Sequence, residues 1–439
     1  MITSIFGRKF LSAYNKKYGT DYDAKTFFIE KFYPLFFDHE KYMMTAGNSP
    51  LENPKISWDK MILGQKPFET PFQRKERFNN LIDKIENSPL DASIALGYPS
   101  LDINATTSGQ ISNISELNHS AEDAYLSWIG AGLGTGVVGG FSILFENDNI
   151  LLDIAEGWKW YRKSIDNTFN MKGNQVSTWN GQWLAHRYSL MYDADNPTAN
   201  FEPYIKKDGL IAVDTQSWTK ILFGISRQSS NAHMIGYIYS FGQTNKTIGF
   251  IPFDLSGIRR LQDLYIKFFD MESGKKAESI WGTAFGFSTA CKAGAIGIRA
   301  LEPKGLKEYI YASGKSQKVK RPSTSINDEQ QILKFNVYKI WIMAMLENEN
   351  LWDKSKEFAQ LLHEYAASIE RGKKDKSNKV ESVLNATNKI GFIKELTEIV
   401  KESEDKETLS EMAHTIASMP TDNVPYFLTL IRFNYAAIK

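Results

Sequence analysis

The chain has 439 residues, a length that predicts two or three domains. Hydrophobic residues make up 42% and charged residues 23% of it, a balance that excludes extended disorder and low-complexity architecture. The 52 basic and 51 acidic residues give a formal net charge of +1, so binding to nucleic acid would require local clusters of charge.

Two further absences narrow the class of protein. No run of eighteen apolar residues occurs, and the segment MITSIFGRKFLSAYNKKYG lacks the pattern of a signal peptide. We therefore expect a cytoplasmic protein with no membrane partner. Cys291 is the only cysteine, which excludes an intramolecular disulfide and an all-cysteine zinc site.

Residues 1–120 are expected to form a helical and loop-rich region with many aromatic side chains. The segment FFIEKFYPLFF holds six aromatic residues in eleven positions, and Pro34 is expected to end its first helical half. Helical spacing recurs at Phe72, Phe78 and Leu81 in FQRKERFNNLIDKIE. Residues 98–120 are polar and rich in turn formers, which predicts a long loop.

Residues 121–315 are expected to form a mixed α/β body with recognition loops. The segments GFSILFENDNILLDI and MIGYIYSFGQTNKTIGFIPF each predict a β-hairpin, and GLIAVDTQSW and TKILFGIS predict further strands. SGIRRLQDLYIKFFDME has the spacing of an amphipathic helix. The glycines of Gly134-Thr-Gly136-Val-Val-Gly139 are interpreted as positions of close backbone approach, with a ligand loop as the alternative.

Residues 325–439 are expected to form a helical bundle after a Lys-rich linker at 312–326. Five segments in this region have three-four spacing of apolar residues, which favours five short helices. The fold class predicted from the whole pattern is α+β, a mixed α/β N-terminal body followed by a C-terminal helical bundle.

Aromatic, cationic and amide side chains alternate between residues 157 and 188. The segment begins with GWKWYRK and continues with turns rich in Asn, Gln and Gly. Cations neutralise phosphates, aromatic rings stack on bases, and amides read base edges, so the pattern predicts contact with nucleic acid. A core with packed tryptophans and amides that cap turns is the competing interpretation. The candidate base- or duplex-reading residues are Asn174, Gln175, Asn180, Gln182, Gln243, Asn245 and Lys246.

The strongest cluster of charge spans residues 292–321, where eight Lys and Arg against two Glu give a local balance of +6. A second basic cluster covers residues 371–379. Each cation that faces a phosphate adds salt-dependent affinity, although a solvated linker explains such a run equally well. The candidate contacts to a nucleic-acid backbone are Lys315, Lys318, Lys320, Arg321, Lys373 and Lys374.

This arrangement resembles the large subunit of type I CRISPR Cascade surveillance complexes. The likeness lies in the loop segments 172–188 and 227–246, the basic joint Lys315–Arg321 and the helical region 325–439. It implies a non-catalytic subunit of an antiviral complex that contacts the end of the guide RNA and the flank of the target DNA. Other protein subunits would then be partners. Neither a cofactor nor a metal is expected, because the six histidines show no metal-ligand spacing and the glycine-rich segments lack the context of a nucleotide-binding loop.

Two other classes of function remain open from the sequence. Asp153, Glu156 and Lys159 lie close together and suggest a metal-dependent nuclease, although the acid–Lys spacing usual in nucleases is missing. A protein-only scaffold or assembly subunit is the second alternative, with the aromatic N-terminal helices as its contact surface.

Overall fold

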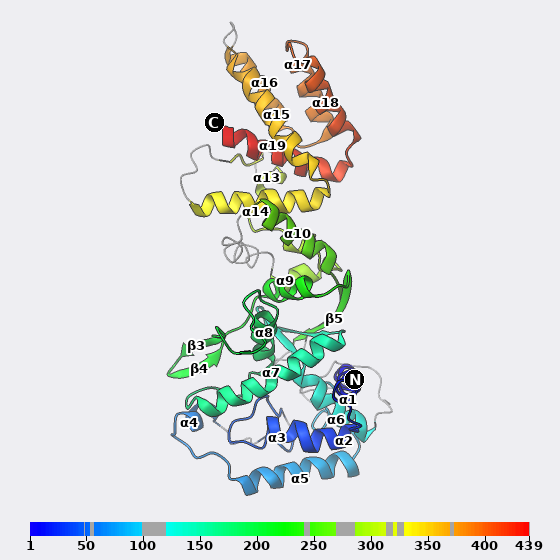
Figure 1. Cartoon of the computed structure of the whole chain (residues 1–439), viewed down its shortest axis with the longest axis vertical. Coiled ribbons are helices and arrows are strands. Elements are labelled where there is room, and N and C mark those ends of the chain that lie inside the picture. The colour runs from blue at the N-terminus through cyan, green and yellow to red at the C-terminus, as the bar shows by residue number, and fades with distance from the viewer. Residues whose placement is uncertain are drawn as a thin grey trace. The chain divides into compact units, whose positions relative to one another are not determined.

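The computed structural model describes residues 1–47, 49–52, 57–98, 120–240, 246–268, 286–312, 319–322, 329–368 and 373–438. It divides into two compact units. Unit 1 is Met1–Leu255 with Gly286–Ala295, and unit 2 is Ser256–Phe285 with Ile296–Lys439. A small antiparallel sheet lies in unit 1 and helices follow in the C-terminal region, so the predicted α+β class is confirmed (Figure 1).

The N-terminal part of unit 1 is helical. Its elements are α1 (Ile2–Tyr18), α2 (Ala24–Phe27), the π-helical turn η1 (Phe28–Phe32), α3 (Tyr33–Phe36), α4 (Trp58–Ile62), α5 (Pro71–Asn87) and α6 (Ala121–Gly132). Two glycines bring α1 and α6 into backbone contact. A Cβ on Gly7 would lie 2.0 Å from the carbonyl oxygen of Leu126, and one on Gly130 would lie 1.9 Å from that of Thr3. This helix pair therefore has no room for larger residues at its crossing point.

Pro34 does not interrupt the aromatic segment as expected. The backbone widens into η1 immediately before the proline and returns to α geometry at Tyr33. Proline lacks an N–H and crowds the preceding turn, and a local π-helical turn is one way in which a helix accommodates it. Phe28, Phe32 and Phe36 consequently stay on the buried face of one continuous helical segment.

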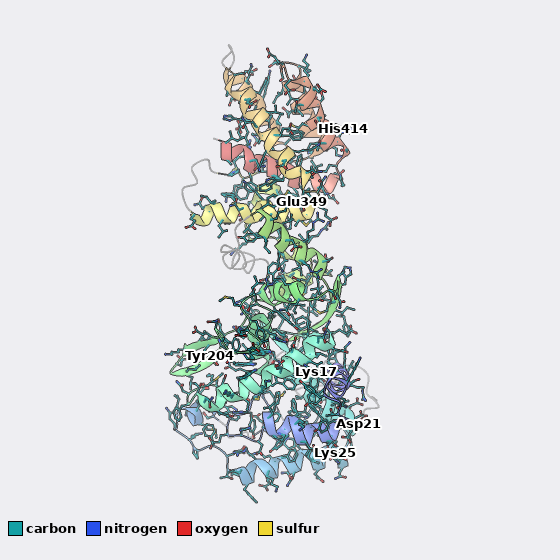
Figure 2. All side chains as sticks on the ribbon, in the orientation of Figure 1. Lys17, Asp21, Lys25, Tyr204, Glu349 and His414 are labelled. Carbon is teal, nitrogen blue, oxygen red and sulfur yellow. The ribbon has the colours of Figure 1, made fainter. Side chains whose placement is uncertain are left out.

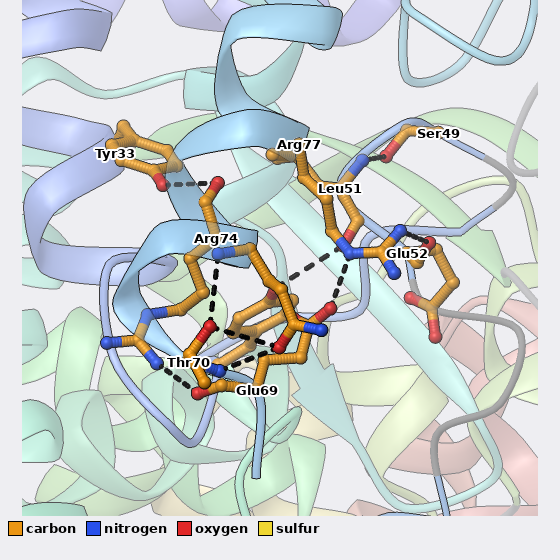
Figure 3. Close-up of polar contacts among 10 residues, drawn as sticks. Tyr33, Ser49, Leu51, Glu52, Glu69, Thr70, Arg74 and Arg77 are labelled. Carbon is orange, nitrogen blue, oxygen red and sulfur yellow. Dashed lines mark hydrogen bonds and ion pairs between the residues drawn. The ribbon is translucent and has the colours of Figure 1, made fainter.

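Helix α5 is held at its start by a network of polar groups (Figure 3). The Thr70 hydroxyl accepts from the Gln73 N–H, and the Gln73 side chain accepts from the Thr70 N–H, which forms a capping box. The buried carboxylate of Glu69 pairs with Arg77 and accepts from the Tyr42 hydroxyl at 3.1 Å. Arg77 also donates to the carbonyl oxygen of Glu52 at 3.0 Å, which fixes the preceding loop against the helix.

The sheet of unit 1 has the strand order β1-β2-β5-β6 and is antiparallel throughout. Its strands are β1 (Thr135–Val137), β2 (Phe141–Phe145), β5 (His233–Ser240) and β6 (Lys246–Asp254). The predicted pairing of residues 234–253 is confirmed by β5 and β6. A β-hairpin was also expected at residues 140–154, and this prediction is wrong in its second half.

That second half is the start of helix α7 (Asp148–Asn167). The Asn147 side chain accepts from the N–H of Ile150 at 3.2 Å and caps the helix, which the apolar run alone did not reveal. The strand expected at residues 219–226 is likewise helix α9 (Trp218–Gln228). Short apolar runs fit a buried strand or a buried helix equally well, which explains both errors.

Helices α7 and α8 (Val176–Arg187) pack together through tryptophans. The indole N–H of Trp179 donates to the carbonyl oxygen of Gly157 at 2.9 Å, and that of Trp183 donates to the carbonyl oxygen of Asp153 at 2.8 Å. A Cβ on Gly157 would lie 2.5 Å from the Trp183 ring, so glycine is required at this crossing.

A two-stranded hairpin, β3 (Tyr204–Lys207) and β4 (Leu210–Val213), extends from the side of unit 1 (Figure 1). Asp208 and Gly209 form its turn, both at positive φ. The parallel bridge between Met171 and Ile211 attaches β4 to the segment that follows α7. The short helix α12 (Phe287–Cys291) completes the described part of unit 1.

Unit 2 is helical in its described residues. Its elements are α10 (Leu255–Phe268), the 3₁₀ turn η3 (Ile298–Leu301), α13 (Lys307–Ile310), α14 (Glu329–Leu346), α15 (Asn350–Ala367), α16 (Lys373–Asn385), α17 (Lys389–Val400), α18 (Lys406–Ser418), the 3₁₀ turn η4 (Thr421–Asn423) and α19 (Val424–Ile438). The predicted helix at 256–272 corresponds to α10. The segment VLNATNKIGFIKELTEIV, residues 383–400, was expected to be a single helix but is divided between α16 and α17. The Asn388 side chain caps the second helix by accepting from the Gly391 N–H at 2.8 Å.

Arg432 of α19 lies in the interior of unit 2, 2% exposed. Its guanidinium donates to the carbonyl oxygens of Leu384 and Ala386 at the end of α16, and to that of Tyr309 in α13 at 3.1 Å. One side chain therefore joins three helices. No helix in the described part of the chain is long and apolar enough to cross a membrane.

Candidate nucleic-acid interface

The predicted backbone-contacting cations that the structure describes are already paired within unit 2. Lys320 Nζ lies 2.9 Å from Glu308 Oε2 and above the ring of Tyr309. Arg321 lies 2.9 Å from Glu381 Oε2, and burial lowers its pKa. Lys315 and Lys318 lie outside the described residues, as do the side chains of Lys373 and Lys374 at the start of α16.

The predicted amides of the α8 segment take part in the protein's own hydrogen bonds. Asn174 has a positive φ of 57°, and its side-chain amide lies between the carbonyl oxygen of Met44 and the indole N–H of Trp58. The Gln175 side chain accepts from the N–H of Val213 at 3.1 Å. These two residues therefore shape the turn before α8.

The base-reading assignment of Asn180 requires a correction, and Gln182 takes part in hydrogen bonds of the fold. Asn180 is fully buried, and its Nδ2 donates to the carbonyl oxygens of Gly132 and Gly134 at 2.8 and 2.9 Å. Gln182 donates to the carbonyl oxygen of Asp214 and accepts from Gln216. A buried amide bonded to two carbonyls cannot reach a base edge, so Asn180 belongs to the core.

The remaining predicted residues lie on the β5–β6 connection. Gln243 and Asn245 are outside the described residues. Lys246 is the first residue of β6, and its side chain is likewise outside the described part. The predicted residues that the structure describes are thus divided between the two units. Asn174, Gln175, Asn180, Gln182 and Lys246 belong to unit 1, and Lys320, Arg321, Lys373 and Lys374 belong to unit 2.

The acidic residues that suggested a nuclease do not form a cluster. Asp153 accepts from the Tyr188 hydroxyl at 2.7 Å and faces Arg187, while Glu156 pairs with Lys159 along α7 at 3.5 Å. Within the described ranges, no group of three or more His, Cys, Asp or Glu side chains is arranged to hold a metal ion. Asp153 instead links α7 to the end of α8.

An exposed surface of cations and rings lies where α7 meets the β3–β4 hairpin. Phe169 is 80% exposed just beyond α7. Tyr204, which is labelled in Figure 2, is 41% exposed on β3. Lys206 lies on the same face of β3 as Tyr204, and Lys207 lies on the opposite face of this exposed strand. Lys163 is exposed in the last turns of α7. We call these five residues the hairpin surface.

Two contacts hold the hairpin surface together. The Tyr204 hydroxyl lies 3.0 Å from Ser164 Oγ of α7, and the Asn170 amide donates to the carbonyl oxygen of Gly209 at 2.8 Å. The hairpin is therefore fixed against the end of α7, and Tyr204 lies beside the residue that follows Lys163.

The cations of this surface carry uncompensated charge. Among the residues that the structure describes, none of the carboxylates is ion-paired with Lys163, Lys206 or Lys207. The nearest acid along α7, Asp166, is occupied by Arg162 at 2.6 Å. Lys163 also lies above the ring of Trp160, at 5.4 Å from its centroid.

The sequence contains a turn signal that predicts the β3–β4 hairpin, although this signal did not enter the prediction. Asp-Gly is a strong signal for a two-residue hairpin turn, and Asp208-Gly209 stands between Tyr-Ile-Lys-Lys and an apolar strand. Only the second strand, β4, was predicted, so Lys206 and Lys207 of the first strand were not recognised as exposed cations.

A cavity of about 490 Å³ lies in unit 1 between the β1–β2 turn and the start of α8. Its floor is one row of the sheet, Gly136, Ser142 and Tyr239, which face one another in the register of β1, β2 and β5. Ser142 Oγ lies 2.8 Å from Ser177 Oγ and also hydrogen-bonds with the Tyr239 hydroxyl. Burial raises the pKa of Tyr239, so its phenol stays neutral at physiological pH.

Gly134 and Gly136 of the segment 134–139 meet the expectation of close approach, whereas Gly139 has a positive φ of 104° and no close contact. A Cβ on Gly136 would lie 2.9 Å from Ser177 Oγ, and one on Gly134 would lie 2.3 Å from the Tyr239 hydroxyl. Gly136 and Gly139 also line the cavity, so part of the segment borders a space large enough for a small ligand.

Comparison with protein-family models, with curated proteins and with solved structures yields no match for this chain. The functional argument therefore depends on the geometry of the chain's own residues.

Proposed function

We propose that the chain is a non-catalytic nucleic-acid-binding subunit, and that the hairpin surface is its principal contact with the nucleic-acid backbone. The observation that supports this most directly is that Lys163, Lys206 and Lys207 are exposed and have no ion-pair partner among the described residues, in the same region as two exposed rings. Lysines that lack a carboxylate partner are available to phosphates, and exposed rings stack on unpaired bases. The surface thus has both chemical components of a contact with a single strand.

The resemblance to Cascade large subunits extends this proposal. In that role the chain would belong to a cytoplasmic, multiprotein antiviral complex and contact the end of the guide RNA and the flank of the target DNA. The helices α14–α19 would then dock a neighbouring subunit. Lys373 and Lys374 at the start of α16 would supply further contacts to the backbone.

The first test measures the binding of labelled single-stranded RNA, single-stranded DNA and duplex DNA at several salt concentrations. The variant K206E/K207E is compared with K16E/K17E, which changes an adjacent pair of exposed lysines on α1 in the same unit. Figure 2 shows Lys17 and Tyr204 on separate parts of unit 1. Both variants carry the same change of charge.

We expect K206E/K207E to lower the affinity at least tenfold and to reduce the salt slope by about 1.4 for single strands, since each phosphate contact contributes about 0.7. K16E/K17E should stay within twofold of the native protein. Equal losses in both variants would show a nonspecific effect of charge and would refute the assignment. If no salt-sensitive binding occurs at low ionic strength, the protein-only scaffold becomes the better hypothesis.

A second test addresses the rings. Phe169→Ala should weaken binding to single strands more than binding to duplex, because stacking requires an unpaired base. An equal loss for both forms of nucleic acid would contradict the stacking role.

A further inference from the structure

We infer that the cavity at the start of α8 accepts one uncharged, unpaired nucleoside, and this inference depends on the proposed binding of nucleic acid. The cavity is a binding site separate from the hairpin surface. Its lining contains apolar and hydroxyl-bearing side chains, and this combination indicates the class of ligand.

The walls of the cavity carry no charge. Among its described lining residues there is no Asp, Glu, Lys, Arg or His. Moving a phosphate into such a space without a neutralising cation would cost several kcal/mol, whereas an uncharged group avoids that cost. The part of a nucleic acid that fits here is therefore the base and sugar, with the phosphates left outside.

The lining of the cavity combines apolar side chains with hydroxyl groups. Met44, Leu96 and Val176 are among its apolar lining residues, and the linked hydroxyls of Ser142, Ser177 and Tyr239 lie on the floor and at the start of α8. A planar base can pack against apolar side chains of this kind while its polar edge or the sugar hydroxyls bond to the floor. The volume of about 490 Å³ lies within the range typical of small-ligand sites.

The cavity is connected by a short stretch of chain to the surface proposed to hold the backbone. Phe169 belongs to the hairpin surface, and Asn174 lines the cavity five residues later. Between them, Lys172 donates its N–H to the carbonyl oxygen of Ile211 at 2.8 Å, which ties this stretch to β4. A strand bound at the hairpin surface would thus have the cavity within reach along residues 169–174.

The test uses the full chain with adenosine, guanosine, cytidine and uridine and their 5′-monophosphates, followed by saturation-transfer NMR and titration. The variant Thr178→Phe places a ring at the wall of the cavity. Thr198→Phe makes the same change at an exposed position of unit 1 away from the cavity. Ser142→Ala removes one hydroxyl from the floor without adding bulk.

At least one nucleoside should bind saturably. Its affinity should change by less than about twofold between about 50 and 200 mM salt, because salt screens interactions between charges and an uncharged ligand has none. Thr178→Phe should weaken this binding at least tenfold, and Thr198→Phe should match the native protein. Ser142→Ala should cost about five- to tenfold, as expected for one hydrogen bond. Thermal unfolding without ligand checks that each variant is folded.

Three results would overturn the inference: no nucleoside binds, Thr178→Phe binds like the native protein, or the monophosphate binds at least tenfold more tightly than its nucleoside. The last result would show a site for anions. A separate experiment tests the proposed function, namely the effect of K206E/K207E on the binding of oligonucleotides. Loss of nucleoside binding with salt-sensitive binding of oligonucleotides retained would remove the cavity site alone.

Discussion

Replacing Arg432 by Met should destabilise unit 2 strongly. The native guanidinium satisfies three main-chain carbonyls in the interior, two of them at the end of α16, where helix carbonyls have no partner of their own. Methionine fills a similar volume but donates no hydrogen bond, so these carbonyls would remain buried and unpaired.

The size of the effect follows from two opposing contributions. An unpaired buried carbonyl costs about 1–3 kcal/mol, and three of them set the upper limit of the loss. Removing the charge gives a partial gain, because burial and the neighbouring Arg321 lower the pKa of Arg432 to about 9, a sign that its charged form is unfavourable there. We expect a net loss of about 3 kcal/mol, equivalent to a fall in Tm of roughly 6–12 °C for a domain of this size.

Urea unfolding followed by circular dichroism measures the total effect, and hydrogen exchange by mass spectrometry locates it. The amides near the end of α16 should lose protection first. Arg432→Lys keeps the charge with a single donor group and should fall between the native protein and Arg432→Met. If Arg432→Met is within 0.5 kcal/mol of the native stability, the gain from removing the charge equals the loss of hydrogen bonds and the reasoning is refuted.

Three further substitutions test other parts of the structure. Burial and Lys356 lower the pKa of Lys339 to about 8. Because the unfolded state then binds more protons than the native state between pH 8 and 10.5, native stability should rise over that range. Lys339→Met should add about 1 kcal/mol of stability at pH 7 and abolish this rise in unfolding scans at different pH values. Asn180→Leu should cost about 1–3 kcal/mol through its two lost carbonyl bonds without altering base preference, whereas a changed preference would restore its reading role. Gly157→Ala should lower Tm despite the better helix propensity of Ala, since its Cβ meets Trp183; an unchanged Tm would show that the ring can move.

Local patterns in the sequence were sufficient for the elements with strong periodicity. The helix at α5, the pair β5 and β6, the helix α10 and the helical C-terminal region all followed from spacing and turn chemistry. Each of these elements is long enough to repeat its apolar spacing several times, so a single exceptional residue does not hide the pattern. The close approach at Gly134 and Gly136 was also expected, since only glycine permits a backbone to come so near.

Short buried segments were decided by tertiary contacts. Residues 150–154 and 219–226 are almost entirely buried, so the period of their apolar residues gave no preference between helix and strand. Their packing against α8 selected helix. Capping by Asn147 and Asn388 added helix starts that hydrophobic spacing did not show.

The site shows the same limit. Residue types alone marked Asn180 as a reader of bases and Lys320 as a contact to phosphates, because an amide or an amine has the same chemistry in any position of a sequence. Only the folded chain shows that Asn180 is enclosed by main-chain carbonyls and that Lys320 has a carboxylate partner. It also shows that Lys206 and Lys207 are exposed on β3 and have no ion-pair partner among the residues that it describes. Sequence determined which chemical groups were available, and tertiary structure decided which of them remained free to bind, since availability depends on what the rest of the chain places beside each group.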